Sequence, residues 1–212
     1  MIGLLYKEFY TLRRYITSYA TALVMFIVLS VLMKSAVYLQ SMLAMSLGML
    51  TLTGMSYDKM YGWDKMVLTM PLKRSQIVLS KYIANAVMGI VSMVISSGLG
   101  IVLLSIIPME EDSLGIMVIT GVLLFAVLLI IYAVILPLMY KFGVERTRIY
   151  MAGVVVLILV GLTTVMEYVP DTFFGYLEDH VVMSGAAFVS FACVCYILSY
   201  FISVGIYQKK EF

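Results

Sequence analysis

Long runs without a charged residue alternate with short charged segments along the whole chain. Six of these runs are long enough to span a membrane, because a helix needs about 20 apolar residues to cross the hydrocarbon core. They are Tyr15–Met33, Ser35–Tyr57, Tyr82–Met109, Ser113–Tyr140, Ile149–Met166 and Val181–Gln208. The pattern predicts an all-α integral membrane protein with six transmembrane helices and both termini on the same side.

The first 14 residues are too charged to cross a membrane, but they have a helical pattern. Their apolar side chains recur at helical spacing, and the charged ones lie elsewhere on the helical wheel: Ile2, Leu5, Phe9 and Leu12 against Lys7, Glu8, Arg13 and Arg14. This pattern predicts an amphipathic helix over residues 1–14 that lies in the membrane interface.

The basic residues set the orientation of the predicted spans. The composition, with 63% hydrophobic and 12% charged residues, is already that of a membrane protein. Thirteen of the 14 lysines and arginines fall on segments of one side, and only Lys34 falls on the other. Because basic residues collect in cytoplasmic loops, we expect both termini to be cytoplasmic and residues 1–212 to form one transmembrane domain.

The segment Tyr57–Tyr82 is the longest polar stretch between the apolar runs. It contains the only tryptophan of the chain, two acids and five bases: Trp63, Asp58, Asp64, Lys59, Lys65, Lys73, Arg74 and Lys81. Pro71 suits a helix start, and Trp63 and Met66 can form an apolar knob with Tyr61 nearby. The segment is either a docking element for a soluble partner or a solvated loop whose bases only follow the orientation rule.

Several kinds of chemistry have no candidate residues. The single histidine, His180, lies in a predicted outer loop, and there is no phosphate-binding GxxxxGK[ST] motif. Cys193 and Cys195 are two residues apart on a predicted helix, so they point in different directions and cannot pair. We expect no enzyme activity, no metal or cofactor bound by this chain and no nucleic-acid partner.

Small residues at helical spacing mark positions where helices can approach closely. Ala44 and Gly48 form one such pair, and Ser96 and Gly100 form another. In the fifth run Gly153, Leu157 and Gly161 lie on one helix face, a candidate dimer seam together with the first run. The spacing fits either packing within one chain or a seam between subunits.

The segment DKMYGWDKMVLTMPLKRSQIVLSKY resembles the first cytoplasmic loop of small ATP-binding-cassette type-2 exporter permeases. The matching positions are Asp58, Gly62, Trp63, Thr69, Pro71, Lys73, Arg74, Lys81 and Tyr82. A second match runs from Pro137 to Arg146, and residues 5–9, Leu-Tyr-Lys-Glu-Phe, are similar to the opening of the family. The resemblance covers the whole chain.

The resemblance implies a permease subunit of an ATP-driven exporter that is moved by separate ATPase subunits. Those subunits would bind ATP and Mg, and a second permease copy, identical or similar, would complete the transporter. The implied coupling loop is 58–81, with contact residues Asp58, Tyr61, Gly62, Trp63, Asp64, Met66, Pro71, Lys73 and Arg74. The implied second cytoplasmic loop contributes Lys141, Phe142, Glu145 and Arg146.

The resemblance also implies a multi-pass protein in contact with the lipid of a bacterial plasma membrane. The apolar spans favour an amphipathic or hydrophobic cargo, peptide or drug-like, that leaves the cell. Two other functions stay open: a stand-alone secondary transporter or channel, and a membrane scaffold or immunity protein that transports nothing.

Overall fold

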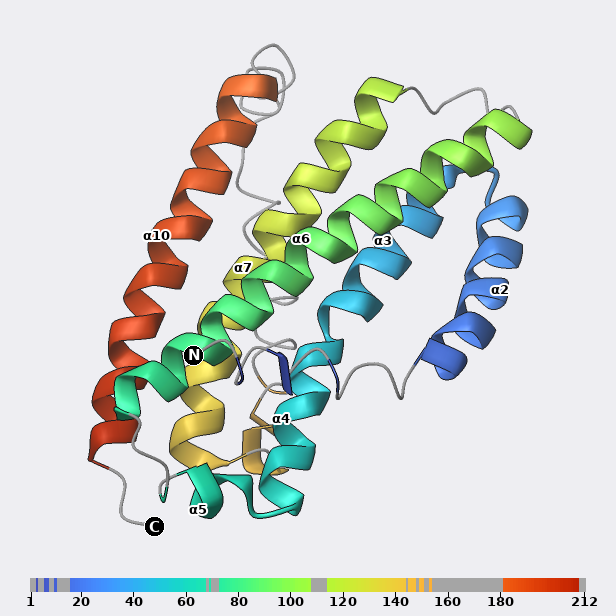
Figure 1. Ribbon diagram of the computed structural model, residues 1–212. Coiled ribbons are helices and arrows are strands. Elements are labelled where there is room, and N and C mark those ends of the chain that lie inside the picture. The colour runs from blue at the N-terminus through green and yellow to red at the C-terminus, as the bar shows by residue number, and fades with distance from the viewer. Residues whose placement is uncertain are drawn as a thin grey trace.

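The computed structural model is mostly helical in the part of the chain that it describes (Figure 1). It describes residues 3, 6, 7, 10, 16–67, 69, 73–107, 114–143, 145–147, 149, 150, 153 and 181–209. The helices are α2 (Ile16–Leu32), α3 (Ala36–Gly48), α4 (Leu50–Met60), α5 (Trp63–Val67), α6 (Arg74–Ile106), α7 (Leu114–Phe142) and α10 (Val181–Gln208). No described residue lies in a strand, and the predicted all-α membrane class is confirmed.

Four helical segments of the described chain are long and apolar enough to cross a membrane. They are Ala36–Met60, which combines α3 and α4, then α6, α7 and residues Val182–Gln208 of α10. They correspond to the second, third, fourth and sixth predicted spans. The first predicted span corresponds to α2, an apolar helix of 17 residues.

The other predicted spans and the ends of the chain fall mostly outside the described residues. Of the fifth predicted span only residues 149, 150 and 153 are described, and of the interfacial segment 1–14 only residues 3, 6, 7 and 10, all of them helical. That the chain has six spans, and on which side its termini lie, therefore stay predictions.

The long helices pack as a bundle with α3, α6 and α7 at its centre (Figure 1). α2 packs on α3 at one edge of the bundle, and α10 packs on α7 and α6 at the other. The short helix α5 lies at the end of the bundle where α4 and α10 finish and α6 begins (Figure 1). The ends of α4 and α10 and the start of α6 thus lie at the same end of the bundle as α5.

α2 and α3 are joined by a tight hairpin at Lys34, the single charged residue between the first two apolar runs. Lys34 turns the chain with a φ of +54°, a left-handed conformation. Ser35 then caps α3, because its Oγ accepts a hydrogen bond from Val37 N at 3.3 Å. Ser30 Oγ donates to the Ser35 carbonyl at 2.7 Å and closes the turn from the α2 side.

The two small-residue pairs of α3 and α6 pack inside this chain. All four residues are buried: Ala44, Gly48, Ser96 and Gly100. A Cβ at Gly48 would lie 2.6 Å from Leu128 Cδ2, and one at Gly100 would lie 3.3 Å from Met117 Sδ. Both glycines therefore let α7 approach, and at these two pairs the spacing reflects packing within one subunit.

The beginning of α6 is fixed to α10 by polar contacts. Tyr82 shares hydrogen bonds of 2.7 Å with Ser199 Oγ and with Ser203 Oγ. Arg74 Nη1 donates to the Gln208 carbonyl at 2.7 Å, at the C-terminal end of α10, where a positive charge is favourable. The segment Arg74–Tyr82 is thus held in place beside the site described next.

Candidate functional site

The candidate site is built around the turn between α4 and α5. α4 ends at Met60 and α5 begins at Trp63, so only two residues reverse the chain. Gly62 has a φ of +68°, which side-chain-bearing residues adopt only at a cost, and its N–H donates to the Lys59 carbonyl at 3.2 Å. At the far end of α5, Val67 is fully buried in the core. The five-residue helix is therefore anchored rather than loose.

Asp58, in the last turn of α4, is a buried acid between two bases. Its side chain pairs with Lys81 of α6 and with Lys7 of the N-terminal segment. Asp58 and Lys81 are only 8% and 6% exposed, so both charges lie where little water reaches them. A carboxylate in such a place is stable only when it is paired. Asp58 therefore joins three parts of the chain at the base of α5.

Trp63 lies beside this ion pair and does not stand out from the surface. Its side chain is half-buried and packs against the core cluster that also contains Val67 and Met139. Lys7 Nζ lies 4.5 Å from the centroid of the indole ring, in the arrangement of a cation–π contact. The indole thus ties α5 to the N-terminal segment.

Three other large side chains of the turn are exposed. Met60, Tyr61 and Met66 are 70%, 69% and 57% exposed. The Tyr61 ring stacks on Tyr57, with 6.2 Å between the ring centroids. We call these three residues the α4–α5 patch. The predicted knob of Trp63 and Met66 is therefore divided: Met66 faces outward, and Trp63 is turned toward the bundle.

The remaining predicted residues of this loop lie apart from the α4–α5 patch or outside the described set. Arg74 binds the end of α10, and Lys73 is exposed directly before α6, where Gln76 Oε1 accepts a hydrogen bond from its backbone N–H at 3.2 Å. The side chain of Asp64 and the whole of Pro71 are among the undescribed parts. α6 begins at Arg74, three residues after the proline.

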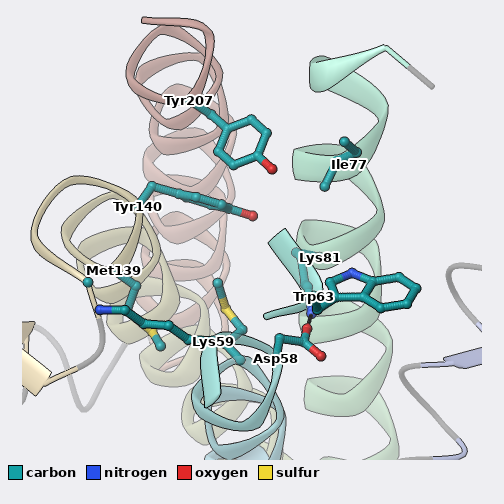
Figure 2. A pocket seen from close by; sticks show the side chains of 10 residues that line it. Asp58, Lys59, Trp63, Ile77, Lys81, Met139, Tyr140 and Tyr207 are labelled. Atoms are coloured by element: carbon teal, nitrogen blue, oxygen red, sulfur yellow. Dashed lines mark hydrogen bonds and ion pairs between the residues drawn. The ribbon is translucent and has the colours of Figure 1, made fainter. Parts of the chain in front are cut away.

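A small pocket of about 50 Å³ lies between the ion pair and the ends of α7 and α10 (Figure 2). Its lining residues come from the five helices α4, α5, α6, α7 and α10 and from Gly143, directly after α7. They are Met55, Asp58, Lys59, Trp63, Ile77, Lys81, Met139, Tyr140, Gly143 and Tyr207. Figure 2 shows Asp58 and Lys81 turned toward one another beside Trp63, while Lys59 extends the opposite way. Tyr140 and Tyr207 form the wall above them, with ring centroids 5.4 Å apart.

The predicted second loop begins where α7 ends. Phe142 closes the helix, its ring lies 4.9 Å from that of Tyr150, and Lys141 Nζ lies 5.0 Å from the Phe142 centroid. Glu145 and Arg146 are exposed. The structure therefore places this loop at the same end of the bundle as the α4–α5 patch, through the contact between Lys59 and Gly143.

Comparison with known proteins identifies the family. The sequence matches the family described as ABC-2 family transporter protein over residues 3–208. The chain belongs to the ABC-2 transporter family. No curated protein and no solved structure matches this permease. Permeases of the ABC-2 family are membrane transport subunits that generally work with an ABC ATPase and are not catalytic themselves.

In this ABC-2 permease the candidate dimer seam is described only at one residue. Gly153 is exposed, and a Cβ placed on it would meet no atom within 4 Å. Leu157 and Gly161 lie outside the described residues, so the seam stays a prediction. Among the described side chains, no group of three His, Cys, Asp or Glu residues could hold a metal ion.

Two residues that complete the site of the permease are not among the predicted site residues. Lys7 fits the polar face of the predicted interfacial helix, but in the structure it pairs with Asp58 and covers Trp63. The second is Val67, which anchors α5 in the core. It lies four residues after Trp63, so both side chains share a helix face, and that spacing was a readable sign that the face is buried.

Proposed function

We propose that this chain is the transmembrane subunit of an ATP-driven exporter and that a separate ABC ATPase docks on the α4–α5 patch. The observation that carries this proposal is the contrast between two surfaces of one turn. Apolar side chains are exposed at Met60, Tyr61 and Met66. Asp58, two residues before Met60, is buried in an ion pair. Exposed aromatic and methionine side chains on an anchored element suit a protein interface.

The arrangement suits the transmission of a push from the ATPase into the membrane. α5 is held to the core by Val67 and Trp63, so a force on its outer surface acts on the whole turn. Asp58 passes that displacement to α6 through Lys81, at the base of a 33-residue helix. A closing movement of the ATPase pair would thereby tilt α6.

The same proposal covers the rest of the transporter. Two copies of the permease, or this chain and a similar one, form the path, and ATP and Mg are bound by the ATPase subunits. The abundance of bases at the end that holds the α4–α5 patch supports a cytoplasmic position in a bacterial plasma membrane. The apolar spans support an amphipathic or hydrophobic cargo, peptide or drug-like, that moves outward.

The docking surface is tested by capture of the ATPase on purified permease variants. Tyr61→Ala and Met66→Ala remove exposed side chains of the α4–α5 patch, so each is expected to weaken capture about tenfold or more without changing membrane abundance. Matched controls are Tyr38→Ala and Met183→Ala, which truncate exposed residues of the same types at the other end of the bundle. Equal capture by the patch variants and their controls would remove the α4–α5 patch from the interface.

A further inference from the structure

Lys59 and Asp58 are consecutive residues of α4 that reach opposite parts of the bundle. Asp58 pairs with Lys81 at the beginning of α6, whereas the Lys59 side chain extends to Gly143, directly after α7 (Figure 2). The Lys59 ammonium group occupies the place that a Cβ of residue 143 would take, and such a Cβ would lie 3.5 Å from Lys59 Cε. The last turn of α4 therefore contacts both neighbouring helices at their ends.

Gly143 is the residue that makes the second of these contacts possible. Its φ of +79° is left-handed, and its N–H donates to the Met139 carbonyl at 3.0 Å, which ends α7 in the usual glycine-capped way. Its carbonyl accepts from Thr147 N at 3.1 Å and from Thr147 Oγ1 at 2.6 Å. The turn after α7 is thus ordered by its own hydrogen bonds, and its open side faces Lys59.

The contact is favourable because of the charge at the end of α7. The last carbonyl groups of a helix carry a partial negative charge, and an ammonium group there is favourable by about two- to fivefold in an equilibrium constant. Lys141 supplies such a charge from α7 itself. Lys59 supplies it from a different helix, so its attraction also holds α4 and α7 together.

The pocket beside these side chains is too small to be a cargo site. A volume of about 50 Å³ leaves room for roughly three or four water molecules, since one needs about 10–15 Å³ of this measure. Its walls are α4, α5, α6, α7 and α10, and they include the helices α4, α6 and α7 that Asp58 and Lys59 connect. The space is therefore a gap between helix ends. We call the contacts of Asp58 and Lys59 that connect these ends, Asp58–Lys81 and Lys59–Gly143, the joint.

We infer that Lys59 is a positioning residue that makes the loop after α7 move together with the α4–α5 turn. The inference rests on the proposed docking of an ATPase and adds a second route to it. A push on α5 reaches α6 through Asp58, and it reaches α7 through Lys59 and Gly143. The second loop then follows the first even where the ATPase does not touch it.

The joint itself is tested on the full-length permease without any ATPase. Spin labels at Met60→Cys and Glu145→Cys, both exposed positions, report the separation of the two loops in a background with Cys193→Ala and Cys195→Ala. The parent and Lys59→Arg are expected to give one narrow distance distribution. Lys59→Met should add a longer component, because the ratio of the short to the long distance falls about two- to fivefold.

The matched control for that measurement is Lys141→Met. It removes a charge from the same end of α7 but breaks no contact with α4. Its distribution should equal that of the parent. An unchanged distribution in Lys59→Met would overturn the inference, because the contact would then not hold the two loops together. An equal broadening in Lys141→Met would also overturn it, because the effect would then only reflect the stability of α7.

The coupled movement is tested on the permease–ATPase complex trapped with ADP–vanadate, against the nucleotide-free complex. Labels at Glu145→Cys and Lys209→Cys report movement of the second loop relative to the end of α10. The parent should show a shift on trapping, and Lys59→Met should lose at least half of it while still capturing the ATPase. A full shift in Lys59→Met would overturn the inference and leave the proposed docking intact.

Failure of the parent itself to bind an ATPase would overturn the proposed function. The measurement without ATPase would still test the joint.

Discussion

The substitution Asp58→Asn removes the carboxylate that pairs with Lys7 and Lys81 while keeping the size of the side chain. The asparagine can still accept a hydrogen bond, so the change isolates the charge. Because the Asp58 and Lys81 side chains are 11% and 8% exposed, little water can replace the lost carboxylate. The Lys7 side chain is 23% exposed and can turn toward solvent more easily.

The loss of stability expected from Asp58→Asn follows from this difference in burial. Removal of one partner of a buried ion pair costs about 3–5 kcal/mol, whereas a surface pair contributes about 0–1 kcal/mol. The pair with Lys81 belongs to the first class, and the pair with Lys7 is intermediate. We therefore expect Asp58→Asn to lower the free energy of unfolding by about 3 kcal/mol, which for a chain of this size lowers Tm by about 6–12 °C.

The assay is thermal unfolding of the purified permease in one fixed detergent, followed by the fluorescence of Trp63, the only tryptophan. Lys7→Met should cost clearly less than Asp58→Asn. The double variant Asp58→Leu with Lys81→Met should cost less than the sum of its single changes, with a coupling of about 1–3 kcal/mol. An Asp58→Asn protein within about 1 °C of the parent, or additive single changes, would refute the argument that this buried pair joins α4 to α6.

The remaining predictions concern packing and backbone, and each is measured by the same unfolding assay, with circular dichroism for the variant that lacks the tryptophan. Trp63→Ala should cost about 2 kcal/mol and weaken ATPase capture, because α5 loses its contact with the core; normal stability and capture would show that Val67 alone anchors the helix. Gly143→Ala should cost more than 1 kcal/mol, since its φ of +79° and Lys59 both oppose a Cβ, whereas Gly98→Ala, in an open helical position, should be neutral or stabilising; equal effects would contradict both arguments. Tyr132→Phe should cost about 1 kcal/mol by removing the hydroxyl that donates to the Gly48 carbonyl, and no change would mean that this bond is not needed for packing.

The bundle could be predicted from the sequence because hydrocarbon excludes charge. Val181–Gln208 is both a charge-free run and the full extent of α10. The criterion fails where a helix leaves the membrane: α6 begins at Arg74, eight residues before the run that starts at Tyr82. Lys81 ends the run without ending the helix, which extends back to Arg74, because charged residues are good helix formers outside the hydrocarbon. A charge-free run marks the membrane boundary of a helix, not its first residue.

The site could be predicted only as a segment. The family resemblance marked Asp58, Gly62 and Trp63, but not which residues they contact. The pairing of Asp58 with Lys7, 51 residues away, depends on how the N-terminal segment, α4 and α6 meet, which no local pattern encodes. The direction of Trp63 is set by the same packing. Its three-residue spacing to Met66 suggested an exposed knob, but the core on the side of Val67 decided otherwise.

The docking of an ABC ATPase on the α4–α5 patch is tested most directly by photocrosslinking in native membranes. A photoreactive phenylalanine analogue replaces Tyr61 in one permease and Tyr38 in the other, both exposed tyrosines at opposite ends of the bundle. We expect position 61 to capture a protein whose sequence contains the phosphate-binding loop of an ABC ATPase, and position 38 not to capture it. An ATPase that purifies with the permease but is never captured from position 61, or is captured equally from position 38, would contradict docking on the α4–α5 patch.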